Sequence, residues 1–451
     1  MNRVTNDSPA DTGALENLRR LIRIPTMSNP DAATADWAAF DLFAATLEEL
    51  YPLLHGALER EFVGGHSLLF RWPGTSAGPA SVLMAHYDVV PATDEGWQHP
   101  PFAAEVTGEG DDRLLWGRGT LDNKGSAVSI LEAVERSIAA GVTPEYDVYL
   151  FFGHDEETNG TGAAAAVEVL TFRGVTIGLV LDEGGAVVEN LFPTVDVPIA
   201  VVGVSEKGIT NFTLTVEQEG GHASTPPRVT ATDRLARAIT RVAANPFPAR
   251  LNAVTATMIR TVGARGRGPL RFVFTRSTLF RPLLVAVFSR MSAETAAMVR
   301  TTTAVTQLSA GLAANALAER AQAVVNVRIA IGSTVEATRR HLERAIADPL
   351  VRVDVLQANE PARVSQTEGP VWQLLADAVN AAYPTAVVTP YVQTGATDSR
   401  HFSAVSRTVY RFSPFEMSTE ERATLHAKNE RMHVKTFFTG IRFFEGLLRK
   451  L

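Results

Sequence analysis

The chain has 451 residues, of which 45% are hydrophobic and 20% charged, and its formal net charge is −7. This length predicts more than one domain and a large core, while the negative charge disfavours nucleic-acid binding, which needs a basic face. The chain has no cysteine, which excludes disulfides, thiolate metal ligands and a cysteine nucleophile. Any metal ion must therefore be held by histidine and carboxylate side chains.

Two features of the sequence bear on location. Residues 1–13 are polar and lack the charged-then-apolar pattern of a signal peptide. The longest apolar run of interest, residues 283–288, is far too short to cross a bilayer. We therefore expect a cytoplasmic protein with no stable insertion into a membrane.

Helix-like and strand-like segments alternate in the first half of the chain. Apolar residues at helical spacing predict helices over 36–51, 127–140 and 163–170. Short apolar or β-branched runs predict strands over 81–85, 146–152 and 177–181. This alternation predicts an α/β fold, a mixed sheet with helices on both faces. In such sheets the chemistry lies beyond the carboxyl ends of the strands.

The middle of the chain has a different pattern. Alternating residues predict strands over 210–217, 321–331 and 351–356, and helical spacing predicts helices over 232–244 and 335–347. This indicates a smaller α+β domain over residues 206–359, inserted into a catalytic domain made of residues 1–205 and 360–451. Helical periodicity resumes after Gly369, and a final helix runs to about Leu447.

The arginine-rich segment 261–291 interrupts the inserted domain. Its apolar residues could belong to the core of that domain. Alternatively, they could line an acyl-chain groove or touch a membrane surface, with the arginines at the rim.

His86 and Asp88 close the strand predicted over 81–85. Side chains two residues apart on a strand share a face, so both would point into one cleft. A carboxylate beside a metal-ligating imidazole fixes the tautomer of the ring. For this motif alone, a structural histidine beside a solvated aspartate is the alternative.

Three further acidic motifs lie next to predicted secondary structure elements. Asp122 lies in a glycine-rich turn before a helix, with spacing that fits neither a P-loop nor a dinucleotide site. It could cap that helix or, with its two oxygens, bridge two ions. Glu156 and Glu157 follow one strand and could be a solvated loop, or one could bind metal while the other moves protons. Asp182 ends the next strand, and the coincidence of these motifs at one sheet edge predicts a metal site.

These motifs, in this order, resemble the M20 family of metallopeptidases and aminoacylases. The resemblance extends from about Leu21 to the final helix. Four further segments resemble a narrower branch of this family, which holds carboxypeptidase S and N-fatty-acyl-amino-acid synthase/hydrolase. These segments are residues 153–157, 182–185, 204–208 and 397–400.

The resemblance implies two divalent cations and their ligands. His86 and Asp182 would hold one ion, Glu157 and His426 the other, and Asp122 would bridge them. Zinc is favoured, and manganese and cobalt stay open because histidine–carboxylate sites accept all three.

The resemblance also implies the remaining roles. Asp88 would orient the histidine beside it, and Glu156 would be the general base. His222, in the inserted lid domain, would stabilise the oxyanion. Asn315 and Arg400 would bind the carboxylate of the substrate.

The chain departs from the family pattern at some positions. Ala316, Leu317 and Ala318 replace the usual Val-Ile-Pro after Asn315. His433 competes with His426 as a ligand, but His426 is followed by Asn-Glu at the spacing of the family.

The implied function is hydrolysis of the amide bond of N-acyl amino acids, with an apolar acyl group and a free carboxylate, and with the reverse synthesis open. The alternative on the same site is a dipeptidase or carboxypeptidase acting on small peptides. A non-catalytic metal-binding protein and a membrane-associated structural protein are further alternatives. The expected partner is a small-molecule substrate, and the chain would be a monomer or a homodimer.

Overall fold

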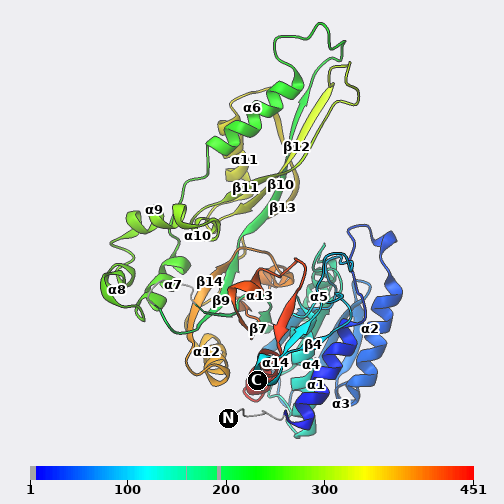
Figure 1. Ribbon diagram of the computed structural model, residues 1–451. Coiled ribbons are helices and arrows are strands. Elements are labelled where there is room, and N and C mark those ends of the chain that lie inside the picture. Colours follow the sequence, from blue (N-terminus) through cyan, green and yellow to red (C-terminus); the bar gives the residue numbers. More distant parts are fainter. Residues whose placement is uncertain (1–6, 159, 190–194) are drawn as a thin grey trace.

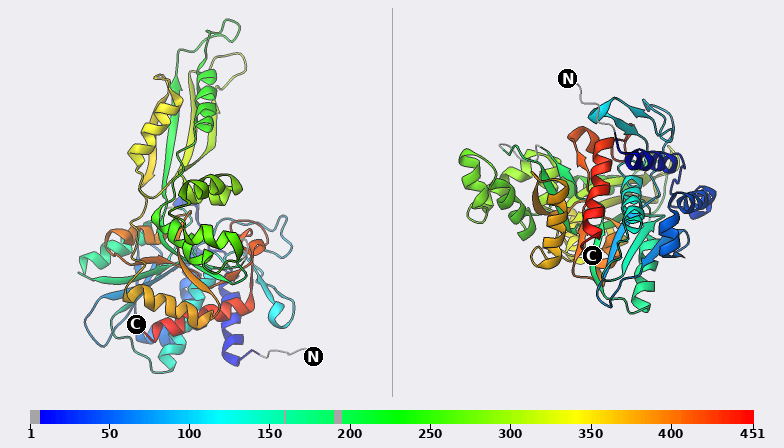
Figure 2. Two further views of the ribbon diagram at one scale, coloured as in Figure 1. Left: turned by 90° about the vertical axis from the view of Figure 1, so that its left-hand side faces the viewer. Right: turned by 90° about the horizontal axis from the view of Figure 1, so that it is seen from below.

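The computed structural model describes residues 7–158, 160–189 and 195–451. It consists of a large domain and a smaller inserted domain that projects away from it (Figures 1 and 2). Among the described residues, no helix has the length and apolarity needed to span a membrane.

A ten-stranded mixed sheet forms the centre of the large domain. In spatial order its strands are β1 (Glu59–Val63), β2 (Ser67–Trp72), β6 (Val148–Gly153), β3 (Ala80–His86), β7 (Ile177–Asp182), β15 (Val409–Arg411), β9 (Ile199–Glu206), β8 (Val187–Val188) and β16 (Glu416–Met417), with β14 (Val387–Gln393) also paired to β9. A small sheet of β17 (Arg431–His433), β5 (Leu114–Trp116) and β4 (Val106–Thr107) lies beside it.

Helices cover both faces of this sheet, as the sequence predicts. The helices of the large domain are α1 (Pro9–Ile22), α2 (Trp37–Leu50), α3 (Pro52–Ala57), α4 (Lys124–Ala139), α5 (Thr161–Phe172), α12 (Pro370–Ala382), α13 (Thr419–Arg422) and α14 (Val434–Leu448). Side chains alternate along β3, so Leu83 joins the core that α1, α4 and α14 line, while Val82 and Met84 join the core under α5.

The inserted domain is a four-stranded antiparallel sheet with two helices. Its strands, in spatial order, are β11 (Thr302–Ala310), β12 (Arg320–Ile329), β10 (Gly208–Glu217) and β13 (Arg352–Asn359). The helices α6 (Ala231–Ala244) and α11 (Val335–Ile346) pack on it over a separate hydrophobic core. Only Lys207 separates β9 of the large domain from β10, which leads up into the inserted domain (Figure 1).

Four helices within the inserted segment lie elsewhere. They are α7 (Ala253–Gly263), α8 (Gly268–Thr275), α9 (Arg281–Met291) and α10 (Ala293–Val299), at the left of Figure 1. Their buried side chains, including Leu284 and Phe288, belong to the core of the large domain and not to that of the inserted domain. Residues 261–291 are therefore not the core of the α+β unit, and α7, at their start, packs on β14 of the large domain.

Candidate active site

Three neighbouring parallel strands end at one edge of the large sheet. The strand order places β3 between β6 and β7, and His86 pairs in register with Gly153. His86 closes β3, Glu156 and Glu157 follow β6, and Asp182 closes β7. The sequence motifs therefore meet beyond the carboxyl ends of the strands, where chemistry is expected in this kind of sheet.

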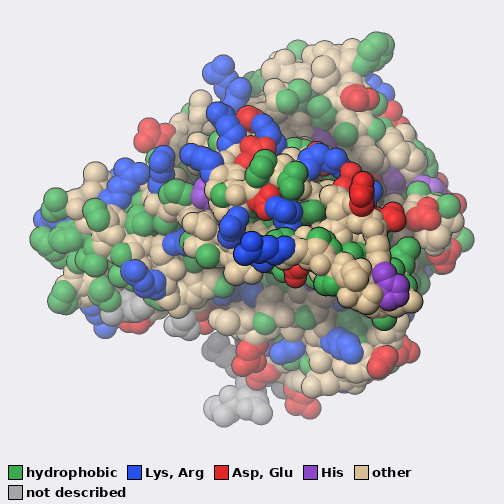
Figure 3. All heavy atoms as spheres, turned by 90° about the horizontal axis from the view of Figure 1, so that it is seen from above, with side chains coloured by type: hydrophobic (Ala, Val, Ile, Leu, Met, Phe, Trp, Pro, Cys, Tyr) green, Lys and Arg blue, Asp and Glu red, His purple; other side chains and the backbone are tan. Residues whose placement is uncertain are grey.

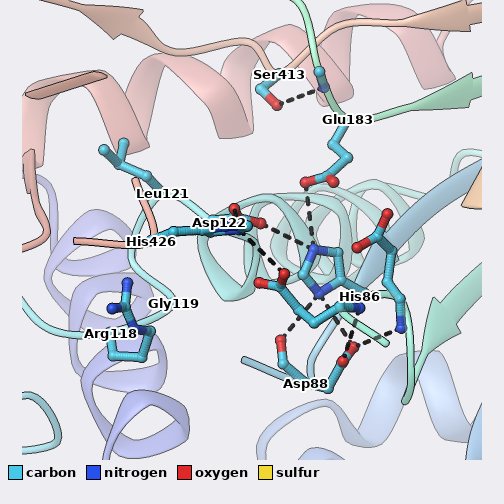
Figure 4. A network of polar contacts seen from close by, with 12 residues as sticks. His86, Asp88, Arg118, Gly119, Leu121, Asp122, Glu183, Ser413 and His426 are labelled. Atoms are coloured by element: carbon cyan, nitrogen blue, oxygen red, sulfur yellow. Dashed lines mark hydrogen bonds and ion pairs between the residues drawn. The ribbon is translucent and has the colours of Figure 1, made fainter. Parts of the chain in front are cut away.

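Asp122 lies between two histidines (Figure 4). Its Oδ1 is 3.0 Å from Nε2 of His86, and its Oδ2 is 3.0 Å from Nε2 of His426. Asn123, not Asp122, occupies the N-cap position of α4, and the Asp122 carboxylate is directed at the imidazoles instead. One carboxylate facing two imidazoles in this way is the arrangement that a bridging ligand needs.

Glutamates complete the cluster on both sides. Glu157 Oε2 is 3.1 Å from Nε2 of His426, and Glu183 Oε2 is 3.5 Å from Nε2 of His86. Potential ligand atoms within 4.8 Å of one another form two overlapping groups, which are His86 with Asp122 and Glu157, and His86 with Glu156 and Glu183. His86 is in both groups, and its Nε2 atom can bind only one cation. A second cation would use His426, which is in neither group but lies 3.0 Å from Asp122 Oδ2 and 3.1 Å from Glu157 Oε2.

The electrostatics of these residues fit two cations. Burial raises the pKa of Glu156 and Glu157, and it raises that of Glu183 to about 8. Burial would raise the pKa of Asp122 too, but hydrogen bonds from its two histidines outweigh burial and hold that pKa below its usual value. Glu157 Oε1 is buried and has no hydrogen-bond partner in the described chain. Crowded buried carboxylates with a free oxygen suit divalent cations, which would offset their charge.

Asp88 is fully buried behind the cluster. Its Oδ1 is 3.2 Å from Nδ1 of His86, whose ring also contacts the Asp88 carbonyl oxygen at 3.0 Å. The same carboxylate accepts hydrogen bonds of 3.2 Å from the backbone N–H groups of Glu156 and Glu157. Asp88 thus ties the end of β3 to the loop after β6.

Asp182 belongs to neither group of potential ligands. Its Oδ2 accepts a 2.8 Å hydrogen bond from the backbone N–H of Ser399. Asp182 thus contacts the segment that carries Arg400, while the Glu183 carboxylate, one residue beyond the end of β7, lies 3.5 Å from Nε2 of His86.

Arg400 lies beside the loop that carries the two glutamates after β6. A Cβ atom at Gly160, whose φ is +64°, would come within 2.5 Å of the Arg400 guanidinium and of the Asp398 carboxylate. A side chain at Gly160 would therefore displace Arg400. Arg400 also donates a 2.9 Å hydrogen bond to the carbonyl of Thr397.

His222 and Asn315 lie together in the inserted domain. The backbone N–H of Ala223 donates to the carbonyl of Asn315 at 3.0 Å, and His222 forms a β-bridge with Ala316. His222 is exposed and follows β10, which runs away from the large domain (Figure 1). The two residues are thus brought to each other but stand apart from the histidine–carboxylate cluster.

Two other histidines, the competing candidate His433 and His154, belong to neither group of potential ligands. His433 precedes α14, where its Nε2 is 3.9 Å from a carboxylate oxygen of Glu421. His154, in the segment 153–157, is buried, and its Nδ1 lies 2.6 Å from the hydroxyl oxygen of Ser67, which is buried too.

Glu430 was not assigned a role from the sequence, although it is fully buried next to the cluster. Its Oε1 accepts backbone N–H bonds from Gly119 at 3.1 Å, Leu121 at 2.9 Å and Asp122 at 3.2 Å. Its other oxygen pairs with Arg118 at 2.5 Å. In the sequence, Glu430 stood out only because it lies four residues after His426, and that spacing does not indicate which groups it contacts.

A mixed α/β sheet, a smaller inserted domain and a cluster of histidine and carboxylate side chains beyond the carboxyl ends of the strands define a metal-dependent hydrolase. The chain belongs to peptidase family M20/M25/M40, whose model matches residues 82–450.

Two relatives are similar in sequence over nearly the whole chain. The N-fatty-acyl-amino acid synthase/hydrolase PM20D1 of Homo sapiens is 34% identical over 441 residues, which cover 96% of this chain and 87% of that protein. Carboxypeptidase S of Saccharomyces cerevisiae is 29% identical over 98% of this chain and 84% of its own length. Both belong to the branch that the sequence motifs resemble.

Solved structures share the fold. The M20 family metallo-carboxypeptidase Sso-CP2 from Sulfolobus solfataricus matches with a TM-score of 0.69 and 18% identity, covering 97% of this chain and 98% of that one. The YXEP protein of Bacillus subtilis, described as a dinuclear metal-binding peptidase, matches with a TM-score of 0.59 and 13% identity, covering 98% and 99%.

Proposed function

We propose that this protein hydrolyses the amide bond of N-acyl amino acids that have an apolar acyl group and a free carboxylate, and that the same site can run the reverse synthesis. The observation that carries this proposal is the 34% identity to an N-fatty-acyl-amino acid synthase/hydrolase over 96% of the chain. The histidine–carboxylate cluster supplies a site with the chemistry that amide hydrolysis needs.

Two divalent cations are proposed to bind this cluster, zinc being favoured. Their ligands would be His86, Glu183, Asp122, Glu157 and His426, with Asp122 between the two. Glu183 replaces Asp182 in this proposal because its carboxylate lies next to His86. When bound, such cations polarise a carbonyl and lower the pKa of water towards about 7.

The side chains around the cations would handle protons and substrate. Glu156 would take a proton from the attacking water and return it to the leaving nitrogen. Arg400 would pair with the carboxylate of the substrate through parallel hydrogen bonds. His222 would donate a hydrogen bond to the developing oxyanion. Asn315 would bind the substrate next to His222, because backbone hydrogen bonding holds the two segments together.

A substrate panel tests the proposal. The purified protein, loaded with zinc, manganese or cobalt, is assayed with N-acyl amino acids of increasing acyl length and with unacylated dipeptides. We expect turnover of the acylated compounds to exceed that of the dipeptides, and expect esters of their carboxylate to react poorly. Turnover of dipeptides alone would refute the proposal.

A dipeptidase or carboxypeptidase is the second candidate. The similarity to carboxypeptidase S and the fold shared with Sso-CP2 favour it. Both candidates need a free carboxylate, so the acyl group is what separates them in the panel. A monomeric or homodimeric state and a cytoplasmic location stay predictions.

A further inference from the structure

The helices α8 and α9 and the turn between them carry an exposed apolar face. Six large hydrophobic side chains there are 38% to 72% exposed, and they are Leu270, Phe272, Leu279, Leu283, Val287 and Met291. Isolated exposed apolar residues are common on any protein surface, but a contiguous group marks an interaction site.

In α9 the exposed residues follow a helical pattern. Leu283, Val287 and Met291 recur every four residues and therefore lie on one side of the helix. Leu284 and Phe288, on the next side, are buried in the core of the large domain. The helix α9 therefore has two apolar sides, and the protein covers only one of them. A helix at a protein surface normally exposes a polar side to water, so the second apolar side indicates a binding surface.

The same stretch is strongly basic. Residues 264–291 contain six arginines and no aspartate or glutamate, in a chain whose net charge is −7. All six arginines are exposed. The guanidinium of Arg276 lies 4.1 Å from the ring centroid of Phe272, so charged and apolar groups are interleaved and not segregated. Figure 3 shows hydrophobic and basic side chains together on the lobe at its left, which is where Figure 1 has α8 and α9.

A pocket of about 430 Å³ adjoins this face, and it is lined by Pro282, Val285, Ala286, Ser289, Arg290 and Arg300. The Ser289 hydroxyl and Nε of Arg300 are buried without a hydrogen-bond partner in the described chain. Arg290 lines the pocket and lies three residues from Val287, so it is a neighbour of the apolar stripe on the same helix. The pocket therefore offers two guanidinium groups and a hydroxyl to an anion next to the apolar stripe.

We propose that this face, residues 264–291 with the adjoining pocket, docks the protein on the surface of an anionic phospholipid bilayer. The exposed leucines and Phe272 would enter the boundary between headgroups and acyl chains, and the arginines would pair with phosphates. The charge decides for a bilayer, since the stretch has six exposed arginines and no acidic residue of its own. Arg267 pairs with Asp196 at 3.1 Å, and the other five arginines complement an anionic surface. The proposal concerns binding and does not depend on the proposed amide hydrolysis.

Vesicle flotation of the full chain tests this. Vesicles of phosphatidylcholine alone are compared with vesicles that also contain phosphatidylglycerol. We expect binding to the anionic vesicles that weakens as salt is raised, and much weaker binding to neutral ones. No binding to anionic vesicles at low salt would overturn the proposal.

Matched variants locate the surface. Leu279→Ser/Leu283→Ser should weaken binding about tenfold or more because apolar contact with the bilayer is lost. Leu312→Ser/Leu356→Ser, at positions 108% and 65% exposed in the inserted domain, should bind as the wild type does. Arg271→Gln and Arg290→Gln should each weaken binding about fivefold. All these side chains are exposed, so thermal unfolding should be unchanged, which confirms that the variants are folded.

Two other occupants of the face give different results. If the wild type is a dimer in light scattering and Leu279→Ser/Leu283→Ser makes it a monomer without any loss of vesicle binding, the face joins two copies and the bilayer proposal fails. If that variant keeps vesicle binding but raises KM for long acyl chains, the face is a substrate groove and the proposal fails as well.

Discussion

Asp122 and its two histidines, which are proposed metal ligands, form ion pairs that decide how protons and cations would compete for the cluster. Hydrogen bonds that His426 donates to the carboxylates of Asp122 and Glu157 raise its pKa to about 10. Protons therefore occupy the cluster when it holds no cation. A metal ion needs the neutral imidazole and the ionised carboxylate, so binding must displace those protons.

Cation affinity should therefore rise with pH. His426, with a pKa of about 10, and Glu183, with a pKa of about 8, each hold a proton at neutral pH in the metal-free protein. We expect affinity to increase about tenfold per pH unit for each proton displaced, and to level off only above those pKa values. Titration calorimetry of zinc in buffers of different ionisation enthalpy counts the protons released. An affinity that is flat from about pH 6 to about pH 8 would contradict this expectation.

Glu183 and Asp182 can be told apart by metal content. Glu183→Gln should lower the bound metal from two ions towards one, because the carboxylate beside His86 is lost. Asp182→Asn should keep both ions and raise KM, since Asp182 holds the segment of Arg400 through Ser399. Elemental analysis of the dialysed variants gives the answer, and the opposite pattern would restore Asp182 as the ligand.

Glu156 should be separable from metal binding. Glu156→Gln keeps the shape of the side chain but cannot accept a proton, so we expect turnover to fall by about two to four orders of magnitude, the usual worth of general base catalysis. The metal content should stay that of the wild type. Loss of activity together with loss of metal would show instead that Glu156 is needed to hold the ions.

At the scale of elements, the site depends on how the loop before β17 meets the turn before α4. Glu430 accepts N–H groups from three residues of that turn and pairs with Arg118. A carboxylate in this position replaces water for backbone groups that burial would otherwise leave without partners. The turn, and with it Asp122, is therefore fixed by a residue from the far end of the chain.

Glu430→Ala should be strongly destabilising. It leaves the Arg118 guanidinium, only 3% exposed, without its buried partner, a change that typically costs about 3–5 kcal/mol. Glu430→Gln keeps an acceptor for the backbone groups and should cost less. Denaturant unfolding measures both, and equal stability of the two variants would mean that the backbone hydrogen bonds are irrelevant to the turn.

At the scale of the whole molecule, two adjacent residues at the junction between the domains, Glu206 and Lys207, bind different parts of the structure. Glu206, at the end of β9, is buried against Arg411 at 3.0 Å and accepts the N–H of Thr397. The Lys207 ammonium group donates to the carbonyl oxygens of Ala297 and Arg300, at the end of α10. The base of the inserted domain is thus anchored, while His222 stands at its far end.

His222 can act on the substrate only if the inserted domain approaches the cluster or a second copy supplies it. His222→Ala should lower kcat by about 10²–10³, the worth of one oxyanion donor, without changing the metal content. His222→Asn, which keeps a donor, should recover part of the rate. Steady-state kinetics with a metal assay decides the matter, and an unaltered kcat in His222→Ala would remove the residue from the chemistry.

The sequence by itself determined the fold class and the position of the site in the chain. Strands predicted over 81–85, 146–152 and 177–181 are β3, β6 and β7, because short apolar or β-branched runs specify such strands without reference to the rest of the chain. The motifs after those strands had to meet, since parallel neighbours end at one edge.

Only the tertiary structure decided which side chains turn inward. Glu183 Oε2 is 3.5 Å from Nε2 of His86, and no local pattern tells which of two adjacent carboxylates approaches a histidine. The choice of Asp182 or Glu183 as a metal ligand stays a prediction. The partners of Glu430 lie more than 300 residues away in the chain, so sequence spacing could not reveal them. The helices α7 to α10 likewise joined the core of the large domain, because long-range packing and not position in the chain determines which apolar faces are covered.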